Sequence, residues 1–170
     1  MRIELEKLEE SGGSFSEVYQ ELPFDEAELR LTDTVTVAGR VRRKQAGEVE
    51  LNGSLRTRVA VPCARCLKPV ELPVEVVFSE RFVPAVAWRD QAQHELNQED
   101  LNLAAFDGKG IELDDLVKEE VLLALPTQVL CRPDCQGLCA VCGADRNETK
   151  CECETKSVDS RWEKLKDLSL

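Results

Sequence analysis

The sequence contains a single histidine, His94, and none of the short motifs that mark common catalytic sites. The GxSxG turn of serine hydrolases, the phosphate-binding P-loop, the glycine pattern of dinucleotide-binding enzymes and the HExxH zinc motif are all absent. One histidine cannot support a typical histidine-dependent hydrolase site, and we assign His94 no role. The acidic pair Glu119 and Glu120 fits the solvated face of a helix. The sequence therefore predicts a protein that is not an enzyme and has no small-molecule substrate.

Long hydrophobic runs are also missing. No apolar stretch approaches the roughly 18 to 20 residues that a membrane helix needs, and the net charge of −11 argues against attraction to anionic membranes. The N-terminal sequence MRIELEKLEE has neither the basic nor the apolar region of an export signal. We therefore expect a cytoplasmic location, no membrane partner and reduced thiols.

Basic residues are scarce overall but concentrated in one stretch. The chain has 22 Lys and Arg against 33 Asp and Glu. Residues 1–33 carry a net charge of −7 and residues 90–126 a net charge of −8, whereas residues 40–68 carry +6. A basic segment therefore lies between two acidic ones.

Three stretches alternate between apolar and polar residues, as half-buried strands do. The first is TVTVAGRVR, beginning at Thr34. After a turn at Gln45 to Gly47, the second alternates strictly from Val49 to Val61. The third runs from Val70 to Phe82, and Glu80 alone interrupts it.

The second and third stretches have matching apolar faces. When Val61 is placed opposite Val70, the same register brings Val59 opposite Leu72, Leu55 opposite Val76 and Val49 opposite Phe82. The sequence therefore predicts a long antiparallel hairpin with the CxxC of Cys63 and Cys66 at its tip.

Residues 113–124 show helical spacing of apolar residues, with Asp114 or Asp115 as the N-cap and Pro126 after the end. Residues 159–168 predict a second, short helix that carries Trp162 on its apolar face. Residues 84–110 are expected to form a variable loop. In residues 1–33, Ile3 and Leu5 suggest a short strand, and the rest suggests turns, loop or a short helix.

These elements predict an α+β fold built on an antiparallel β-sheet with a long hairpin, one covering helix and a cysteine-rich, zinc-binding C-terminal module. We expect residues 1–126 to form the α+β core and residues 127–170 to form the zinc module and the terminal helix.

The eight cysteines form four close pairs, and six of them lie between residues 131 and 153. Zinc prefers four thiolates in a tetrahedron, and a close pair on a tight turn can place two sulfurs on one ion. Four pairs therefore predict two structural Zn²⁺ sites. Iron–sulfur clusters and disulfides are the alternatives. The pairs are Cys63 with Cys66, Cys131 with Cys135, Cys139 with Cys142, and Cys151 with Cys153.

The spacing favours one assignment of pairs to ions. Only eight residues separate Cys142 from Cys151, so the last two pairs can close a compact local site, which leaves the first two pairs for the other ion. The alternative joins Cys63 and Cys66 to Cys139 and Cys142, and spacing does not exclude it. Asp145 could add an oxygen ligand, although a turn residue is the simpler interpretation.

The basic segment predicts a charged strand face. Side chains alternate between the two faces of a strand, so four arginines point away from the apolar side, and two further basic residues lie at the CxxC. Guanidinium groups bind phosphate oxygens well, so this face is a candidate RNA-binding surface. The alternative is an ordinary solvated sheet face. The six residues are Arg40, Arg42, Arg56, Arg58, Arg65 and Lys68.

The order of these motifs resembles the YceD family, which is associated with large-subunit ribosomal RNA accumulation in bacteria and plastids. The resemblance rests on CARC, LVKEEVLLALP, CRPDCQGLCAVCGADRN, CEC and DSRW, within about residues 49–168. Where the family has Asp-Pro-Arg, this chain has Asp159, Ser160 and Arg161, a departure that bears on the terminal helix. The resemblance implies a non-enzymatic factor in ribosome assembly or 23S rRNA maturation, without a molecular mechanism.

Our leading hypothesis is a zinc-binding factor that contacts pre-rRNA or the assembling large subunit. A protein-binding adaptor that docks basic ribosomal proteins on the acidic segments is one alternative. A thiol redox sensor that uses the zinc cysteines as a switch is another.

Overall fold

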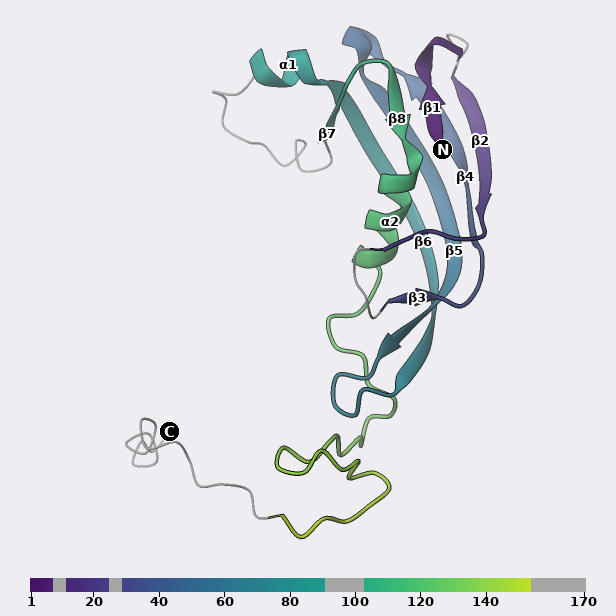
Figure 1. Cartoon of the computed structure of the whole chain (residues 1–170). Coiled ribbons are helices and arrows are strands. Elements are labelled where there is room, and N and C mark those ends of the chain that lie inside the picture. Colours follow the sequence, from purple (N-terminus) through teal and green to yellow (C-terminus); the bar gives the residue numbers. More distant parts are fainter. Residues whose placement is uncertain (8–11, 25–28, 91–102, 154–170) are drawn as a thin grey trace.

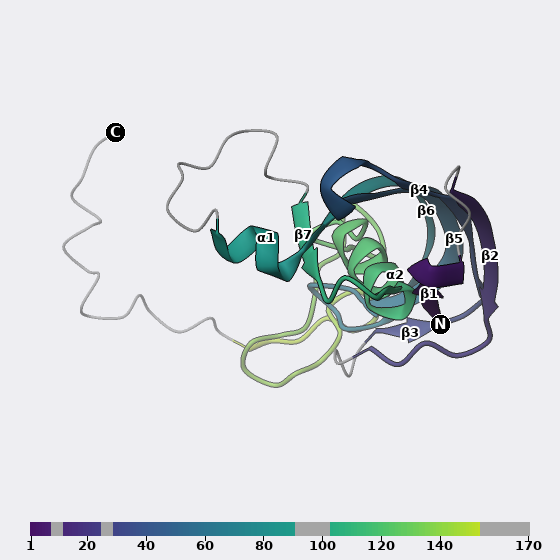
Figure 2. The ribbon, with the colours of Figure 1, turned by 90° about the horizontal axis from the view of Figure 1, so that it is seen from above.

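The computed structural model describes residues 1–7, 12–24, 29–90 and 103–153. A strongly curved sheet wraps around helix α2, and the cysteine-rich segment extends beyond one end of the sheet (Figures 1 and 2). The described elements are β1 (Arg2–Glu4), β2 (Gly13–Tyr19), β3 (Arg30–Leu31), β4 (Val35–Arg43), β5 (Val49–Pro62), β6 (Pro69–Pro84), α1 (Ala85–Asp90), β7 (Leu103–Phe106), β8 (Gly110–Glu112), α2 (Leu113–Leu123), and 3-10 turns at Leu5–Lys7 and Gln45–Gly47.

The main sheet has the strand order β2-β4-β5-β6-β7, and β3 pairs with Val59 and Ala60 near the C-terminal end of β5. A separate two-stranded ladder joins β1 to β8. All these pairs are antiparallel except β6 with β7, which are parallel. The fold is therefore α+β as predicted, but the sheet is mixed. The prediction of an antiparallel sheet was wrong at this one edge, because periodicity does not reveal the direction of a neighbouring strand.

The hairpin of β5 and β6 has the predicted register. Val61 pairs with Val70, Val59 with Leu72, Leu55 with Val76 and Val49 with Phe82. A shift of one residue would turn every apolar side chain of β5 to solvent, so the burial pattern selects this alignment. The hairpin tip therefore carries Cys63 and Cys66 past the last strand pair, Pro62 with Pro69.

The core lies between the concave face of the sheet and α2. Valines and leucines of β4 and β5 are fully buried there, and α2 contributes its own apolar stripe. The cysteines are not part of this core: Cys63, Cys66 and Cys135 form a second small buried cluster with Val70 and Leu130 packed against it. The α2 residues buried in the core are Leu113, Leu116, Val117 and Val121.

Several local predictions need correction. The strand β2 was not predicted, and residues 84–110 are not all loop because they include α1, β7 and the start of β8. The N-cap of α2 is Glu112, whose side chain makes no capping hydrogen bond, whereas Asp114 and Asp115 lie in the first turn. In the first turn, the two carboxylates stabilise the helix because they lie near the positive, N-terminal end of its dipole. The short strand at Ile3 is present as β1.

Candidate metal centres

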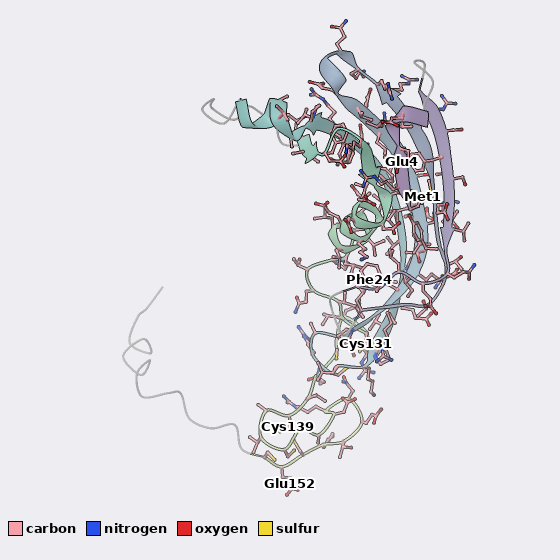
Figure 3. All side chains as sticks on the ribbon, turned by 45° about the horizontal axis from the view of Figure 1, so that its top comes forward. Met1, Glu4, Phe24, Cys131, Cys139 and Glu152 are labelled. Atoms are coloured by element: carbon pink, nitrogen blue, oxygen red, sulfur yellow. The ribbon has the colours of Figure 1, made fainter. Side chains whose placement is uncertain are left out.

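The eight cysteines gather into two groups of four. Cys63 and Cys66 lie at the hairpin tip, and Figure 3 shows Cys131 beside the tip and Cys139 farther from the sheet. All eight are free thiols, and within each group the sulfurs lie within 4.8 Å of one another. The grouping is the one that the spacing favoured, not the exchanged one. We call the group of Cys63, Cys66, Cys131 and Cys135 the first centre, and the group of Cys139, Cys142, Cys151 and Cys153 the second centre.

The sulfur spacing fits a tetrahedral ion. A zinc ion with Zn–S bonds of about 2.3 Å holds its sulfurs about 3.8 Å apart. In the first centre, the Sγ atoms of Cys63 and Cys135 are 3.8 Å apart and those of Cys66 and Cys131 are 3.6 Å apart. A disulfide would need about 2.05 Å. Both groups could hold a metal ion, and the donor set of four thiols suits a thiophilic one.

The two CxxC turns have the same backbone geometry. The Cys63 carbonyl accepts from the Leu67 amide at 3.0 Å, and the Cys139 carbonyl accepts from the Gly143 amide at 2.9 Å. Leu67 and Gly143 both have positive φ, 61° and 74°. Glycine adopts that conformation without strain, whereas leucine does not. The predicted turn at Gly143 is therefore present, and the hairpin tip repeats it with a leucine that is 62% exposed.

The segment that follows α2 docks directly on the hairpin tip. The Ala64 amide donates to the Val129 carbonyl at 2.7 Å, and the Leu138 amide donates to the Arg65 carbonyl at 3.0 Å. The Arg65 guanidinium also donates to the Cys135 carbonyl at 2.8 Å. These bonds bring Cys135 to the tip, so the first centre takes two ligands from each side of the predicted domain boundary at residue 126.

The two centres differ in exposure. In the first centre only Cys131 is exposed, whereas Cys63, Cys66 and Cys135 are buried. In the second centre Cys139 and Cys151 are half-buried, and the other two cysteines are exposed. Solvent and oxidants therefore reach the second centre more easily.

Each centre contains thiols that are predisposed to ionise. In the first centre, hydrogen bonds from Asn147 and the Gly137 amide outweigh burial and lower the pKa of Cys135. The amide of Cys66 lowers the pKa of Cys63 to about 6, and the amide of Cys142 lowers the pKa of Cys139 to about 6. Burial raises the pKa of Cys131 to about 12. A bound cation would therefore displace protons from the remaining thiols, as in other thiolate metal sites.

Asp145 is not among the clustered ligand atoms. Its Oδ2 lies 2.8 Å from Nζ of Lys68 on the hairpin, and this ion pair holds the pKa of Asp145 at about 2. Lys68 also pairs with Glu148, and the two carboxylates raise the pKa of Lys68. Asp145 is therefore not placed as a metal ligand. It forms an ion pair that links the hairpin to the spacer of the second centre, residues 143–150.

The predicted arginine face is exposed on the side of the sheet that α2 does not cover. Arg40 pairs with Asn52 and Arg56 with Thr36, so these side chains share one face. Arg30, which was not predicted, lies on β3 opposite Ala60 and adds to that face. Its strand has two residues, too few for a periodic signal. We call Arg30, Arg40, Arg42, Arg56 and Arg58 the arginine face.

Counter-charges occupy part of this surface. Nε of Arg56 lies 3.8 Å from Glu75, and Nη1 of Arg58 lies 4.0 Å from Glu71. In the described part of the chain, no carboxylate forms an ion pair with Arg40 or Arg42. Arg65 and Lys68, predicted to extend this surface, instead make the contacts described above within the metal-binding end.

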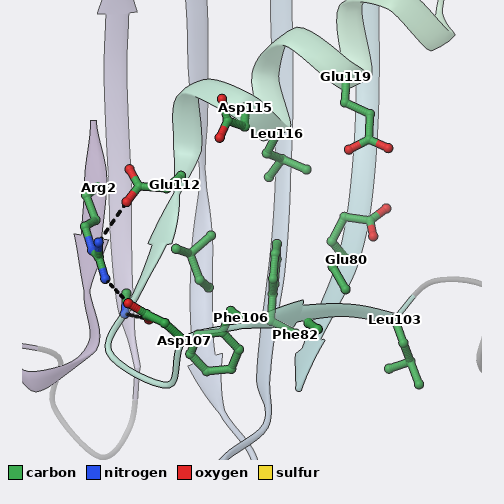
Figure 4. A pocket seen from close by; sticks show the side chains of 14 residues that line it. Arg2, Glu80, Phe82, Leu103, Phe106, Asp107, Glu112, Asp115, Leu116 and Glu119 are labelled. Atoms are coloured by element: carbon green, nitrogen blue, oxygen red, sulfur yellow. Dashed lines mark hydrogen bonds and ion pairs between the residues drawn. The ribbon is translucent and has the colours of Figure 1, made fainter. Parts of the chain in front are cut away.

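A groove of about 470 Å³ opens between α2, β6 and β7 (Figure 4). At one end, Nη1 of Arg2 lies 2.9 Å from Glu112. Glu80 and Glu119 point toward each other across the groove (Figure 4). The pKa of Glu80 is raised, mainly by burial and to a lesser extent by the negative charges of Glu120 and Glu119. In the sequence, the only indication of this groove was Glu80, which interrupts the apolar face of the strand. The floor and walls include Phe82, Phe106, Leu116, Glu80, Asp115 and Glu119.

Two sequence predictions, His94 and the helix at residues 159–168, lie outside the described residues. Among the residues that are described, no helix is both long and apolar enough to cross a membrane.

A pair of glycine substitutions tests the docking of the C-terminal segment. Gly137 and Gly143 both have positive φ, so alanine at either position should cost about 1–2 kcal/mol. Only at Gly137 would the new Cβ also meet backbone, the Arg65 carbonyl oxygen at 2.9 Å, whereas Gly143 has nothing within 4 Å. Gly137→Ala should therefore lower the melting temperature more than Gly143→Ala in thermal unfolding of the metal-loaded protein. Equal losses would contradict the close approach of Gly137 to the hairpin.

Comparison with known proteins supports the resemblance. A family model described as "Large ribosomal RNA subunit accumulation protein YceD" matches residues 51–169. A protein of Mycobacterium tuberculosis described as uncharacterised is 33% identical over 71% of this chain and 55% of its own length. The chloroplastic large ribosomal RNA subunit accumulation protein YCED homolog 1 of Zea mays is 28% identical over 68% of this chain and 47% of its own.

A third relative, the uncharacterised protein YlbN of Bacillus subtilis, is 27% identical over 84% of this chain and 78% of its own length. The chain spans about half the length of the mycobacterial and maize relatives, and no solved structure matches. The family model covers well over half of the chain and includes all eight cysteines. The chain belongs to the YceD family of large ribosomal RNA subunit accumulation proteins.

Proposed function

We propose that this chain is a non-enzymatic, cytoplasmic zinc-binding factor in large-subunit ribosome biogenesis, which promotes accumulation or processing of 23S rRNA by contacting pre-rRNA or the assembling particle. Membership of the family supports the biological role, as does the name of the maize relative. The observation that supports the molecular part is the arginine face, which spans β3, β4 and β5 of the sheet and so includes one strand of the hairpin that carries the first centre at its tip.

Zinc is the ion that suits both centres. Four thiolates saturate a tetrahedral Zn²⁺, so no position stays open for an activated water, and such sites usually contribute folding energy rather than catalysis. In the first centre, Cys63 and Cys66 would share the ion with Cys131 and Cys135, which ties the hairpin to the chain after α2. The four cysteines of the second centre would close a local loop.

The arginine face suits an RNA backbone. Arginine forms bidentate hydrogen bonds with phosphate oxygens. Arg40 and Arg42 are exposed and form no ion pair among the described residues, although Arg42 lies opposite Glu50. The pairs of Arg56 and Arg58 with glutamates are long and exposed, at 3.8 and 4.0 Å, and exposed pairs of this kind contribute little. Phosphate could therefore displace those glutamates at small cost.

The groove favours a second candidate function, a protein-binding adaptor. Its apolar floor and its facing carboxylates, Glu80 and Glu119, suit a basic segment of a ribosomal protein. Burial first, and then repulsion from Glu120 and Glu119, raises the pKa of Glu80. A bound cation would relieve the repulsive part.

The metal content is the first test of this function. Elemental analysis of the purified protein should find two zinc ions per chain. Because the main core contains no cysteine, removal of zinc with a chelator should leave most of the strand signal in circular dichroism but lower the melting temperature. One zinc per chain, or iron with visible absorbance, would contradict the proposal. If a small molar excess of hydrogen peroxide over protein released the zinc, the result would instead favour the redox-sensor alternative.

Serine substitutions compare the two centres. The first centre closes a span of 64 residues between Cys66 and Cys131, and the second closes one of eight between Cys142 and Cys151. From loop-closure entropy alone, the longer span should add about 2 kcal/mol of stability. Cys66→Ser should therefore lower the free energy of unfolding more than Cys153→Ser, measured by denaturant titration with zinc present. Equal losses would show that the first centre does not tie the chain together.

Substitution of four of the five arginines in the arginine face tests contact with RNA. Glutamine at Arg40, Arg42, Arg56 and Arg58 should leave zinc content unchanged, weaken binding to 23S rRNA fragments and reduce the salt slope by about 1 for each phosphate that the variant no longer binds. Arg65 is kept, since it holds the Cys135 carbonyl. The control replaces Lys109 and Lys118, away from this face, with glutamine. Unchanged affinity and slope in the folded variant would instead favour the adaptor.

A further inference from the structure

The spacer between the two halves of the second centre reaches back to the first centre. Residues 143–150 separate Cys142 from Cys151, and a spacer that only closed the second centre would need no contact elsewhere. Instead, Nδ2 of Asn147 lies 3.4 Å from Sγ of Cys135 in the first centre. Cys135 is buried, and its contact with Asn147 is partly buried. A hydrogen bond is stronger inside a protein than in water.

The orientation of the Asn147 amide is set by its other partners. Its Oδ1 accepts from the Gln136 amide at 2.8 Å and from Nη2 of Arg132 at 2.7 Å. Its Nδ2 donates to Oδ1 of Asp145 at 2.6 Å. A flipped amide would put oxygen against the carboxylate and nitrogen against two donors, so the N–H must face the sulfur.

The same spacer also holds the hairpin side of the first centre. Oδ1 of Asp145 accepts from the Asn147 backbone amide at 2.9 Å, and its Oδ2 pairs with Lys68 at 2.8 Å. Lys68 lies two residues after Cys66, and its carbonyl accepts from the Cys63 amide at 2.8 Å. The spacer therefore contacts both segments of the chain that supply the first centre.

We propose that Asn147 is a positioning residue for Cys135, delivered by the spacer of the second centre, and that the two centres consequently bind metal cooperatively. Closing the second centre fixes the spacer, and the spacer holds the sulfur of Cys135 in place with an N–H donor. Partners of this kind typically change metal affinity by 10- to 100-fold. Because coupling is reciprocal, metal in the first centre must equally favour metal in the second. The inference rests on the metal binding in the proposed function, not on contact with RNA.

The test measures metal retention in each centre of the full-length, zinc-loaded protein. After addition of a chelator, alkylation of each cysteine is followed over time by mass spectrometry, so that exposure of Cys135 reports the first centre. Asn147→Ala should speed alkylation of Cys135 by about 10-fold. The matched control is Asn52→Ala, on β5 in the main sheet, which should leave the rate unchanged. An unchanged rate in Asn147→Ala would overturn the proposal.

Asn147→Asp serves as a second variant. It keeps an acceptor for Gln136 and Arg132. It removes the N–H donors to the Cys135 sulfur and to Asp145 and places a carboxylate oxygen beside both, so Cys135 loses its partner. Faster alkylation of Cys135 in this variant is expected even if Asn147→Ala does not fold. A rate equal to that of the unmodified protein would show that the N–H donor has no role.

A double-mutant cycle separates positioning from general destabilisation. Cys153→Ser opens the second centre and should speed alkylation of Cys135 several-fold when Asn147 is present, but add little when Asn147 is already alanine. Equal acceleration in both backgrounds would overturn the coupling. Failure of the proposed function is distinguishable, because it would appear as absent zinc or absent RNA binding in the unmodified protein.

Discussion

The contact between the hairpin tip and the chain after α2 is the constraint on which the rest of the metal-binding end depends. Backbone bonds from Ala64 to Val129 and from Leu138 to Arg65 align the two segments. Without them Cys131 and Cys135 would not reach the tip, and the spacer would have no first centre to contact. The curved sheet has its own core and presents the long hairpin; the tip contact turns that hairpin into part of a binding site.

Much of the central fold could be predicted from the sequence because its strands are long and have one dry face. Val49 to Val61 and Val70 to Phe82 allow one register that buries both apolar faces, and the structure has it. The strands β2 and β7 could not be found in this way. The first begins at Gly13 and buries only Phe15, so it shows no apolar alternation. The second pairs in parallel with β6 after residues 91–102. Such pairing depends on distant chain, not on local alternation.

The grouping of the cysteines could be predicted from spacing, because eight residues can close a local centre and two pairs then remain. The residues around the sulfurs could not. Asn147 is one polar residue in a polar spacer, and neither its distance from Cys135 along the chain nor its type marks it. Its role follows from the fold of the spacer, which brings its amide between Asp145 and the sulfur. Arg30 on β3 was missed for a similar reason.

The clustering of eight thiols in one end of the molecule affects its electrostatics. A zinc ion with four thiolates carries a formal charge of −2, so two such ions would move the chain from −11 to −15. The added negative charge would lie at the hairpin tip and beyond it, and Arg65 and Lys68 at the tip already make contacts within the protein. A polyanion would then be repelled from the tip and drawn toward the arginine face of the sheet. The hairpin would carry a charge gradient along its length, which would orient an approaching nucleic acid before any contact forms.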